Sequence, residues 1–358
     1  GDGPFHRQIG LIPDDREGMQ MGGEGRAREL LDSFLFRRGR EYTFAMSSPV
    51  TADTHCSRLS PYLAWGNIST RQVVHAARLR LAQLFDTPRN QQDWDHPDWI
   101  RSVKAFQSRI HWRCHFIQKL ETEPEIEFYN FMRTYDGLRE DDFDWAKFDA
   151  WADGRTGYPL VDACMRYLRR TGWLNFRMRA MLVSFAAYSL WLHWREPALH
   201  LARLFVDYEP GIHYSQMQMQ SGTTGINTPR LYNPTKQATD QDPKGAFIRR
   251  WVPELAGVHE AYLVQPWTMP RYLQERSGCI IGQHYPAPIV DHDKASRAAK
   301  ARIYALRERP DVQAEAKRVL TIHGSRRGPQ RFSSRDGVFP KSKAKSAAKK
   351  PQADGPQQ

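Results

Sequence analysis

Tryptophan and arginine stand side by side at three places in the chain, Trp112-Arg113, Trp194-Arg195 and Arg250-Trp251. An aromatic face beside a guanidinium group suits a large planar ligand that carries phosphates, such as a flavin nucleotide or a base pair. Most tryptophans of a globular protein fill its core instead. Because the chain holds 11 tryptophans, the three pairs are candidate binding residues, with core packing as the alternative.

The segment Cys56-Ser57-Arg58-Leu59-Ser60-Pro61 has the composition of a helix start. Pro61 fits the first helical turn, and the two serines supply hydroxyl groups. Free amides at a helix start, two hydroxyls and an arginine together suit an anion such as a phosphate. Ordinary helix capping produces the same pattern, so both interpretations stay open.

The elements that would position these residues are helices. Apolar residues recur at helical spacing over 30–35, 73–85, 101–118, 160–170, 174–194 and 197–206. Alternation with a period of two is nearly absent, and no strand pattern precedes a glycine-rich loop, which argues against a Rossmann or P-loop nucleotide site. We therefore expect an all-α fold. Proline and glycine gather over 210–234, where we expect a long irregular loop.

Composition narrows the class of protein further. Of 358 residues, 40% are hydrophobic and 26% are charged, which is enough for a real core. The richest apolar stretch, 180–194, is too short to span a membrane, so we expect no membrane association. The four cysteines form no CxxC pair and have no paired histidine, which argues against a zinc site or an iron–sulfur cluster. Scattered thiols suit a cytoplasmic protein.

The basic charge is confined to one end of the chain. Residues 294–358 hold 17 basic and 5 acidic side chains and so carry the whole net charge of +12. We expect a flexible lead-in over 1–22, a helical domain over 23–290, a helical basic extension over 291–335 and a disordered basic tail over 336–358. Such a tail attracts DNA phosphates whatever the base sequence, unless it is only a solvated end.

Six separated blocks resemble the helical FAD-binding domain of the DNA photolyase/cryptochrome family, in the family's order over roughly residues 23–270. They are CSRLSPYLAWGNIS (56–69), HWRCHF (111–116), WADGRTGYPLVDACMRYLRRTGW (151–173), RMRAMLVSFAAYSLWLHWRE (177–196), RLYNPTKQ (230–237) and DQDPKGAFIRRWVPEL (240–255). The resemblance implies a photolyase/cryptochrome-type helical FAD-binding domain with disordered termini, and FAD as the cofactor. The α/β antenna domain that normally precedes it is not in the sequence. We therefore expect a stand-alone flavin domain, either naturally short or a shortened chain.

The resemblance also implies which residues contact FAD. The residues beside its phosphates are Tyr42, Cys56, Ser57, Arg58, Leu59, Ser60 and Arg113. Cys56 stands where threonine is common and keeps only its backbone amide for this purpose. Arg179 and Asp207 correspond to an ion pair over the flavin ring, and Glu209 stands where a second aspartate is usual.

His213 corresponds to the asparagine that faces flavin N5 in repair photolyases. A histidine there can donate or accept a proton near neutral pH and so change which reduced flavin state persists. The alternative is a histidine that only satisfies a neighbouring carbonyl group.

The chain departs from the family where repair enzymes hold the DNA lesion. Arg109 stands where a glutamate hydrogen-bonds the lesion, Phe176 replaces an asparagine, and Asn175 replaces a histidine. Trp112 and Arg177 remain, whereas Met217 and Met219 replace a tryptophan pair. The residues that the resemblance places toward DNA are Arg109, Trp112, Asn175, Phe176, Arg177, Met219 and Gln237.

Methionine does not carry an electron hole as tryptophan does. Of the family's electron-transfer tryptophans, only Trp194 matches in register, and Trp145 is a displaced candidate for the outer position. Trp191 or Trp173 offers another path.

We therefore expect a monomeric FAD protein that binds DNA, in particular ultraviolet-damaged DNA, with light-driven electron transfer from reduced FAD to a pyrimidine lesion. Arg109, Trp112 and His213 are its candidate catalytic residues. Two alternatives stay open. One is a cryptochrome-like photoreceptor or a light-independent damage-binding protein without repair activity. The other is a helical DNA-binding module that has lost its flavin.

Overall fold

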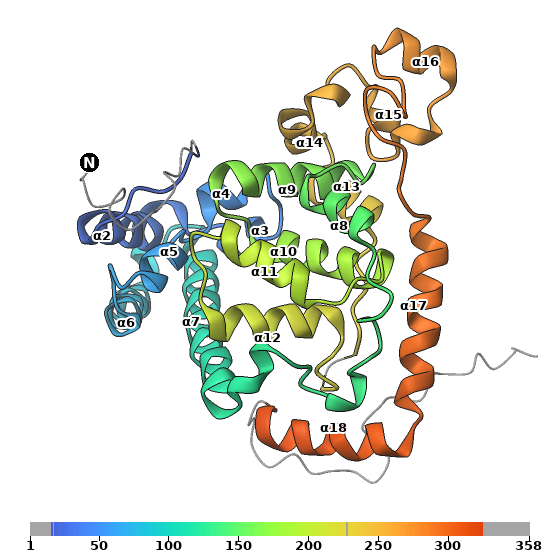
Figure 1. Cartoon of the computed structure of the whole chain (residues 1–358). Helices are drawn as coiled ribbons and strands as arrows, with labels where there is room; N and C mark the ends of the chain where they lie inside the picture. The colour runs from blue at the N-terminus through green and yellow to red at the C-terminus, as the bar shows by residue number, and fades with distance from the viewer. Residues whose placement is uncertain (1–15, 17, 227, 325–358) are drawn as a thin grey trace, which may run out of the picture.

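The computed structural model describes residues 16, 18–226 and 228–324, which are almost entirely helical and loop regions (Figure 1). The helices of the first half are α2 (Glu24–Ser33), α3 (Tyr42–Ala45), α4 (Ala52–His55), α5 (Ser60–Ala64), α6 (Thr70–Asp86), α7 (His96–Thr122), α8 (Trp145–Ala152) and α9 (Pro159–Thr171). They are followed by α10 (Phe176–Ser184), α11 (Arg195–Leu204), α12 (Pro210–Ser221), α13 (Pro234–Gln241), α14 (Ala246–Trp251), α15 (Glu260–Leu263), α16 (Arg271–Arg276), α17 (His292–Arg307) and α18 (Pro310–His323).

Short helical turns of other types join these helices. Two π-helical turns span Phe34–Arg38 and Phe185–Ser189, and 3-10 turns span Arg89–Gln91, Pro124–Glu127, Arg133–Tyr135, Pro253–Leu255 and Pro266–Thr268. Between 16 and 324, apart from the two residues not described, β structure is limited to one isolated bridge, Ile281 to Tyr285. The all-α expectation is confirmed.

Local sequence signals explain several helix ends. Ser69 and Gln72 form a reciprocal capping box at the start of α6. Pro159 begins α9, whose C-cap is Gly172 with a left-handed φ of 71°. A β-carbon at Gly172 would lie 2.4 Å from the Val206 side chain, so both the backbone conformation and the space favour glycine.

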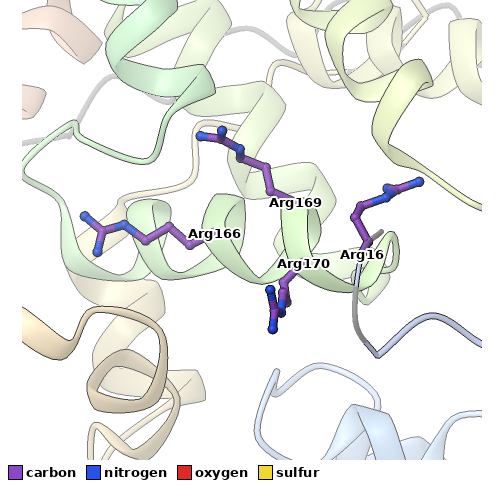
Figure 2. A pocket seen from close by; sticks show the side chains of 4 residues that line it. All are labelled: Arg16, Arg166, Arg169 and Arg170. Atoms are coloured by element: carbon purple, nitrogen blue, oxygen red, sulfur yellow. The ribbon is translucent and has the colours of Figure 1, made fainter. Parts of the chain in front are cut away.

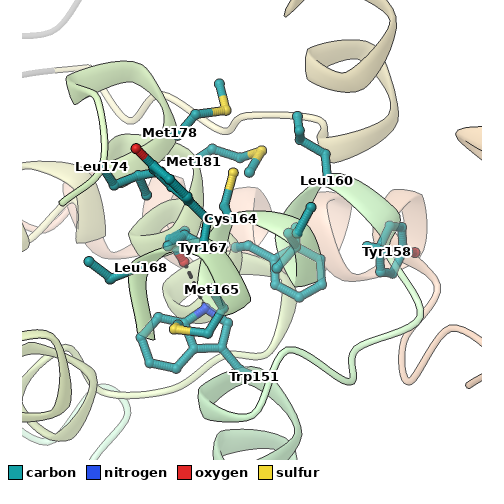
Figure 3. Packing of buried hydrophobic residues seen from close by; sticks show 14 of the residues in the cluster. Trp151, Tyr158, Leu160, Cys164, Met165, Tyr167, Leu168, Leu174, Met178 and Met181 are labelled. Carbon is teal, nitrogen blue, oxygen red and sulfur yellow. Dashed lines mark hydrogen bonds between the residues drawn. The ribbon is translucent and has the colours of Figure 1, made fainter. Parts of the chain in front are cut away.

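The main hydrophobic core is built around α9 and α10. Figure 3 shows Trp151, Leu160, Cys164, Leu168 and Met181 packed together between these helices. A second core lies under α2, α6 and α7 and includes Val73, Ala77 and Phe106. The long helix α7 borders both parts of the bundle, because it packs against α6 on one side and against α12 on another (Figure 1).

The prediction of an irregular loop over 210–234 is wrong for the first half of that range, because residues 210–221 form helix α12. Pro210 occupies the first helical position, where its missing N–H has no consequence. Gly211 lets α12 approach α7 closely, since a β-carbon there would lie 2.6 Å from the Ile117 Cα atom. The glycine therefore serves helix packing and does not mark a turn.

The basic extension packs against the rest of the protein through α17 and α18 (Figure 1). The Tyr158 hydroxyl donates to the Val290 carbonyl at 2.7 Å and accepts from the His292 amide at 3.1 Å, which anchors the start of α17. Residues 325–335 of the expected extension and the expected tail over 336–358 lie outside the described residues, as does most of the expected lead-in over 1–22. Within the described part of the chain, none of the helices combines the length and hydropathy needed to cross a bilayer.

Candidate functional site

Three segments converge beside α7. Arg113 on α7 reaches the Leu63 carbonyl of α5 at 3.3 Å and Glu209, the residue before α12, at 3.0 Å. Arg109, one turn earlier on α7, lies over the Phe176 ring at the start of α10. Residues predicted from separate sequence blocks are therefore brought together at one place.

The loop 56–60 is held by an arginine that the sequence analysis did not single out. Arg38 donates hydrogen bonds to the carbonyl of Cys56 and, at 2.6 Å, to that of Ser57. Burial lowers the pKa of Arg38 to about 10, which still leaves it charged at neutral pH. Nothing in its sequence context marks Arg38, since the partners lie 18 and 19 residues away.

With those carbonyls facing Arg38, the loop offers amide donors. The backbone N–H groups of Ser57, Arg58 and Ser60 have no acceptor among the residues that the structure describes. Arg58 adopts a left-handed φ of 59°, which turns successive peptide groups. A turn with several unused N–H groups and a cation behind its carbonyls fits phosphate oxygens. The interpretation of this segment as an anion site is thus supported by geometry as well as by composition.

The side chains of this loop hold it in place. The Arg58 guanidinium carbon lies 3.9 Å from the Trp173 ring centroid, and this arginine also pairs with Asp53. Burial raises the pKa of the Cys56 thiol to about 12, so Cys56 stays protonated and does not act as a thiolate. Arg58 and Cys56 therefore contribute structure and backbone to the site.

The predicted ion pair between Arg179 and Asp207 is present. The two guanidinium nitrogens lie 3.1 and 2.8 Å from the two carboxylate oxygens, and the Asp207 side chain is only 3% exposed. The Arg179 guanidinium also stacks over the Phe205 ring at 4.0 Å. A bidentate pair at a buried position keeps both groups charged and oriented.

His213 differs from the expectation of a group that titrates near neutral pH. It is buried, and its Nε2 atom donates to the Ala198 carbonyl at 2.8 Å. Burial lowers the pKa of His213 to about 4, with the Arg179 charge as a further contribution. The ring is therefore neutral at pH 7. Because a carbonyl only accepts, Nε2 carries the proton and Nδ1 presents a lone pair.

Around Arg109 the structure presents an aromatic and basic surface, here called the mouth and made of Arg109, Trp112 and Phe176. The Arg109 guanidinium carbon lies 5.7 Å from the Phe176 ring centroid, and Trp112 is 40% exposed. Burial raises the pKa of the neighbouring Tyr42 to about 12, opposed by the charge of Arg109. Arg177 and Met219 are partly exposed on the adjoining helices α10 and α12.

Two residues expected to contact DNA have buried side chains instead. Asn175 is 2% exposed and donates to the carbonyls of Met46 and Ser47 at 3.1 and 2.8 Å. Gln237 on α13 is also buried. Neither side chain is exposed for direct contact with DNA in this structure, and the contact itself stays a prediction. Asn175 holds the turn after α3.

The candidate electron-transfer residues occupy very different surroundings. Trp194 is buried, and its ring centroid lies 6.3 Å from that of Tyr214. Trp145 is exposed on α8 and contacts the Phe148 ring at 5.6 Å. Tyr214 was missed from the sequence, although it adjoins His213 at 5.4 Å.

The two alternative tryptophans are each covered by arginine. Trp173 lies under Arg58, and the Trp191 ring lies between Arg139 at 4.5 Å and Arg302 at 4.8 Å. Positive charge next to an indole ring disfavours a positive hole on it. Of the candidates, buried Trp194 therefore has the better surroundings for electron transfer.

A separate cavity of about 320 Å³ is lined by four arginines, Arg16, Arg166, Arg169 and Arg170 (Figure 2). Figure 2 shows that three of them come from α9 and extend in different directions. Arg166 is paired with Glu254 at 2.8 Å and Arg169 with Asp153 at 3.0 Å. These ion pairs weaken the attraction of the cavity for an outside anion, so we do not assign it to the functional site.

Comparison with known proteins now decides the family. The family described as the FAD binding domain of DNA photolyase matches residues 106–305, more than half of the chain. The chain belongs to this photolyase family.

Its relatives include both photolyases and cryptochromes. The chain is 34% identical to a deoxyribodipyrimidine photo-lyase of Vibrio cholerae over 77% of this chain and 54% of that protein. It is 32% identical to cryptochrome-2 of Arabidopsis thaliana over 80% of this chain and 45% of that protein. A crystal structure of a class III photolyase from Agrobacterium tumefaciens superposes with a TM-score of 0.73 at 30% identity, covering 85% of this chain and 61% of the photolyase. The chain spans about half the length of the curated relatives it matches.

FAD is the cofactor of this photolyase-family domain. The residues present fit it, because the free amides of loop 56–60 suit a diphosphate and the Arg179–Asp207 pair is preformed. When bound, FAD supplies an electron that light can mobilise. The loop would hold the phosphate end, and the ion pair would orient charge beside the ring. Neutral His213 would offer Nδ1 as an acceptor.

Proposed function

We propose that this chain is a monomeric FAD protein that binds ultraviolet-damaged DNA and carries out light-driven electron transfer to a pyrimidine lesion. The observation that carries the proposal is the arrangement of α7. One side of this helix directs Arg113 toward the Leu63 carbonyl of α5 and toward Glu209. Another side exposes Arg109 and Trp112 at the mouth. A cofactor site and a surface for a flat, anionic ligand thus share one rigid helix.

The mouth supplies what a flipped-out nucleotide needs. Trp112 and Phe176 are half exposed and offer faces on which a base can stack. A damaged base pair costs less to unstack than an intact one, which favours lesions over normal DNA. Arg177, partly exposed next to Phe176, is available to a phosphate.

Arg109 gives the mouth a different electrostatic character from that of a site with a neutral acid. Reduced FAD, when bound, would supply the electron that light moves to the lesion, and the bonds between the two pyrimidines would break before the electron returns. No net reductant is consumed. During this cycle the lesion is negatively charged, and the guanidinium of Arg109 stabilises that charge.

The test is the variant Arg109→Gln, measured for binding of lesion-containing DNA and for repair under light. Repair should fall at least ten-fold while binding falls much less, because the charge acts mainly on the electron-bearing state. An equal loss of binding and repair would mark Arg109 as a binding contact only. Arg271→Gln on α16, also exposed and away from α7, is the control for a lost surface charge.

A second function is favoured by the methionines. Met217 and Met219 stand on α12, and Met217 is buried. Their thioethers neither stack on a lesion as a tryptophan does nor relay a hole. A flavin photoreceptor, or a protein that binds damaged DNA without repairing it, tolerates methionines in place of the family's two tryptophans. If the fully reduced protein repairs neither cyclobutane dimers nor six-four photoproducts, this second function stands and the enzyme is rejected.

The DNA partner also sets the expected location. A protein that acts on DNA lesions is proposed to be cytoplasmic and to associate with the nucleoid while bound to DNA. Fluorescence microscopy of a tagged chain before and after ultraviolet exposure checks this, and a signal that stays away from the DNA would contradict it.

A further inference from the structure

The first half of α7 presents two cations, each next to an exposed phenylalanine of a neighbouring helix. The Arg101 guanidinium carbon lies 5.3 Å from the ring centroid of Phe44 on α3, which is 63% exposed. The Lys104 ammonium lies 5.0 Å from the ring centroid of Phe85 on α6, which is 56% exposed. We call these four residues the α7 track.

The fold does not need these rings. The Ser102 hydroxyl of α7 donates to the carbonyl of Arg40, just before α3, at 2.6 Å, and Tyr42 of α3 is buried. Helix α6 is fixed by Leu84, which is 3% exposed. Phe44 and Phe85 therefore leave most of their surface in water, and neighbouring residues already make the core contacts of these two helices.

The track leads to the mouth. Arg101 and Trp112 lie on the same face of α7, about three turns and roughly 16 Å apart. Around this line of α7 the pairing of an exposed ring with a cation repeats, at Phe44 with Arg101, Phe85 with Lys104 and Phe176 with Arg109. Lys104 lies about 60° to one side of the line and Arg109 about 80° to the other. Lys104 has no carboxylate partner in the described ranges, and Arg101 has only a long contact of 3.4 Å to Asp98. The cations are thus available to an outside anion.

We infer that the α7 track binds unpaired nucleotides of the DNA strand that enters the mouth. This inference rests on the proposed DNA-binding function and names the part of the DNA that this surface recognises. Rings and cations in alternation match a single strand, whose bases expose their faces between phosphates. The bases of an intact duplex are stacked on each other and leave only phosphates for contact, which would not use Phe44 or Phe85.

The experiment measures binding of an unmodified single-stranded oligothymidine by fluorescence anisotropy at several salt concentrations, with the protein in its flavin-loaded form. Phe44→Ala and Phe85→Ala should each weaken binding about five-fold or more, the effect of losing one stacking platform. The double variant Arg101→Ala, Lys104→Ala should make the slope of log affinity against log salt shallower by about 1.4, since each single-strand phosphate contributes roughly 0.7.

A matched control is available on α16. Arg271→Ala with Tyr272→Ala removes an exposed basic and an exposed aromatic residue outside the track, and it should leave affinity and slope unchanged. Flavin absorbance and circular dichroism of every variant establish that the protein is folded. Arg101→Lys, Lys104→Arg keeps both charges and should restore the slope.

Each result decides the inference. Unchanged oligothymidine binding in the track variants overturns the inference. If these variants instead differ from the unaltered protein in sedimentation coefficient, the occupant of the track is a second copy of the chain. Equal losses for duplex and single strand show phosphate contact alone and also overturn it. If the unaltered protein binds lesion DNA and the track variants bind oligothymidine equally well, the proposed function stands and only this inference falls. If the unaltered protein binds no DNA, both fall.

Discussion

Arg38 offers the sharpest test of how the phosphate loop is built. Its side chain donates to the carbonyls of Cys56 and Ser57, with longer contacts of 3.3 Å to those of Leu30 and Thr54. In the variant Arg38→Met the stem is kept and the donors are lost. The two closest carbonyls then lie partly buried without a partner, and the loop loses the cation that orients them.

The expected loss of stability follows from these contacts. A hydrogen bond from a charged donor contributes about 1.5–3 kcal/mol. Two such bonds, taken at the lower end because Arg38 is only partly buried, give about 3 kcal/mol. We also expect flavin to be released, because the loop that carries the N–H groups of Ser57, Arg58 and Ser60 loses its support. Urea unfolding and flavin absorbance per protein after gel filtration measure the two effects.

The neighbouring residue supplies the control. Arg37 is exposed, so Arg37→Met should change the unfolding free energy by no more than about 0.5 kcal/mol and keep the flavin. Arg38→Lys keeps the charge but not the fork of donors, and it should fall between the two. Full flavin content in Arg38→Met, or a stability loss no larger than that of Arg37→Met, would refute the assignment of Arg38 as the support of the loop.

Four further predictions concern charge. Arg113→Ala should release flavin without unfolding the protein, because a charge-assisted contact to phosphate is lost. Glu209→Gln should retain flavin more tightly than the unaltered chain, because it frees Arg113 from its ion pair at 3.0 Å; flavin dissociation followed by fluorescence checks both, and unchanged dissociation rates would contradict them. The pKa of His213 is lowered from 6.5 to about 4, so the unfolded chain takes up a proton that the folded chain does not. The unfolding free energy should therefore fall by about 3 kcal/mol between pH 6.5 and pH 4, and urea midpoints of His213→Asn should lack this part of the pH dependence. Deletion of residues 341–358 removes five lysines and one aspartate. It should make the slope of log affinity for DNA against log salt shallower by a few units at most, since each neutralised phosphate contributes roughly 0.9. An unchanged slope would mean that this segment is a solvated end.

Most helices were predictable because the signals for a helix, apolar spacing and capping residues, lie within the segment that forms it. Apolar spacing over 73–85 and 101–118 corresponds to α6 and α7, and the serine and glutamine that cap α6 are only three residues apart. The resemblance to the family added one contact that spacing alone does not contain. Arg179 and Asp207 are 28 residues apart, and the structure pairs them as the resemblance implied.

The tertiary structure decided which way side chains point. Arg38 looks like any basic residue in the sequence, yet it supports the loop 56–60 because the turn after α2 brings it behind that loop. Asn175 resembles a binding residue, yet its amide turns inward to Met46 and Ser47. Both outcomes depend on segments far away in the chain, so no local pattern contains them.

Burial decided the chemistry of groups whose residue type was known from the start. His213 is neutral at pH 7 because α12 packs it against Ala198 and out of water, and desolvation penalises its charged form. Residues 210–221 are helical, despite Pro210 and Gly211, because the glycine lets α12 approach α7. The sequence by itself determined most of the helices and the family, and it predicted the residues of the site. Their orientation, protonation and partners depend on distances between segments remote in sequence, and only the packed structure sets those distances.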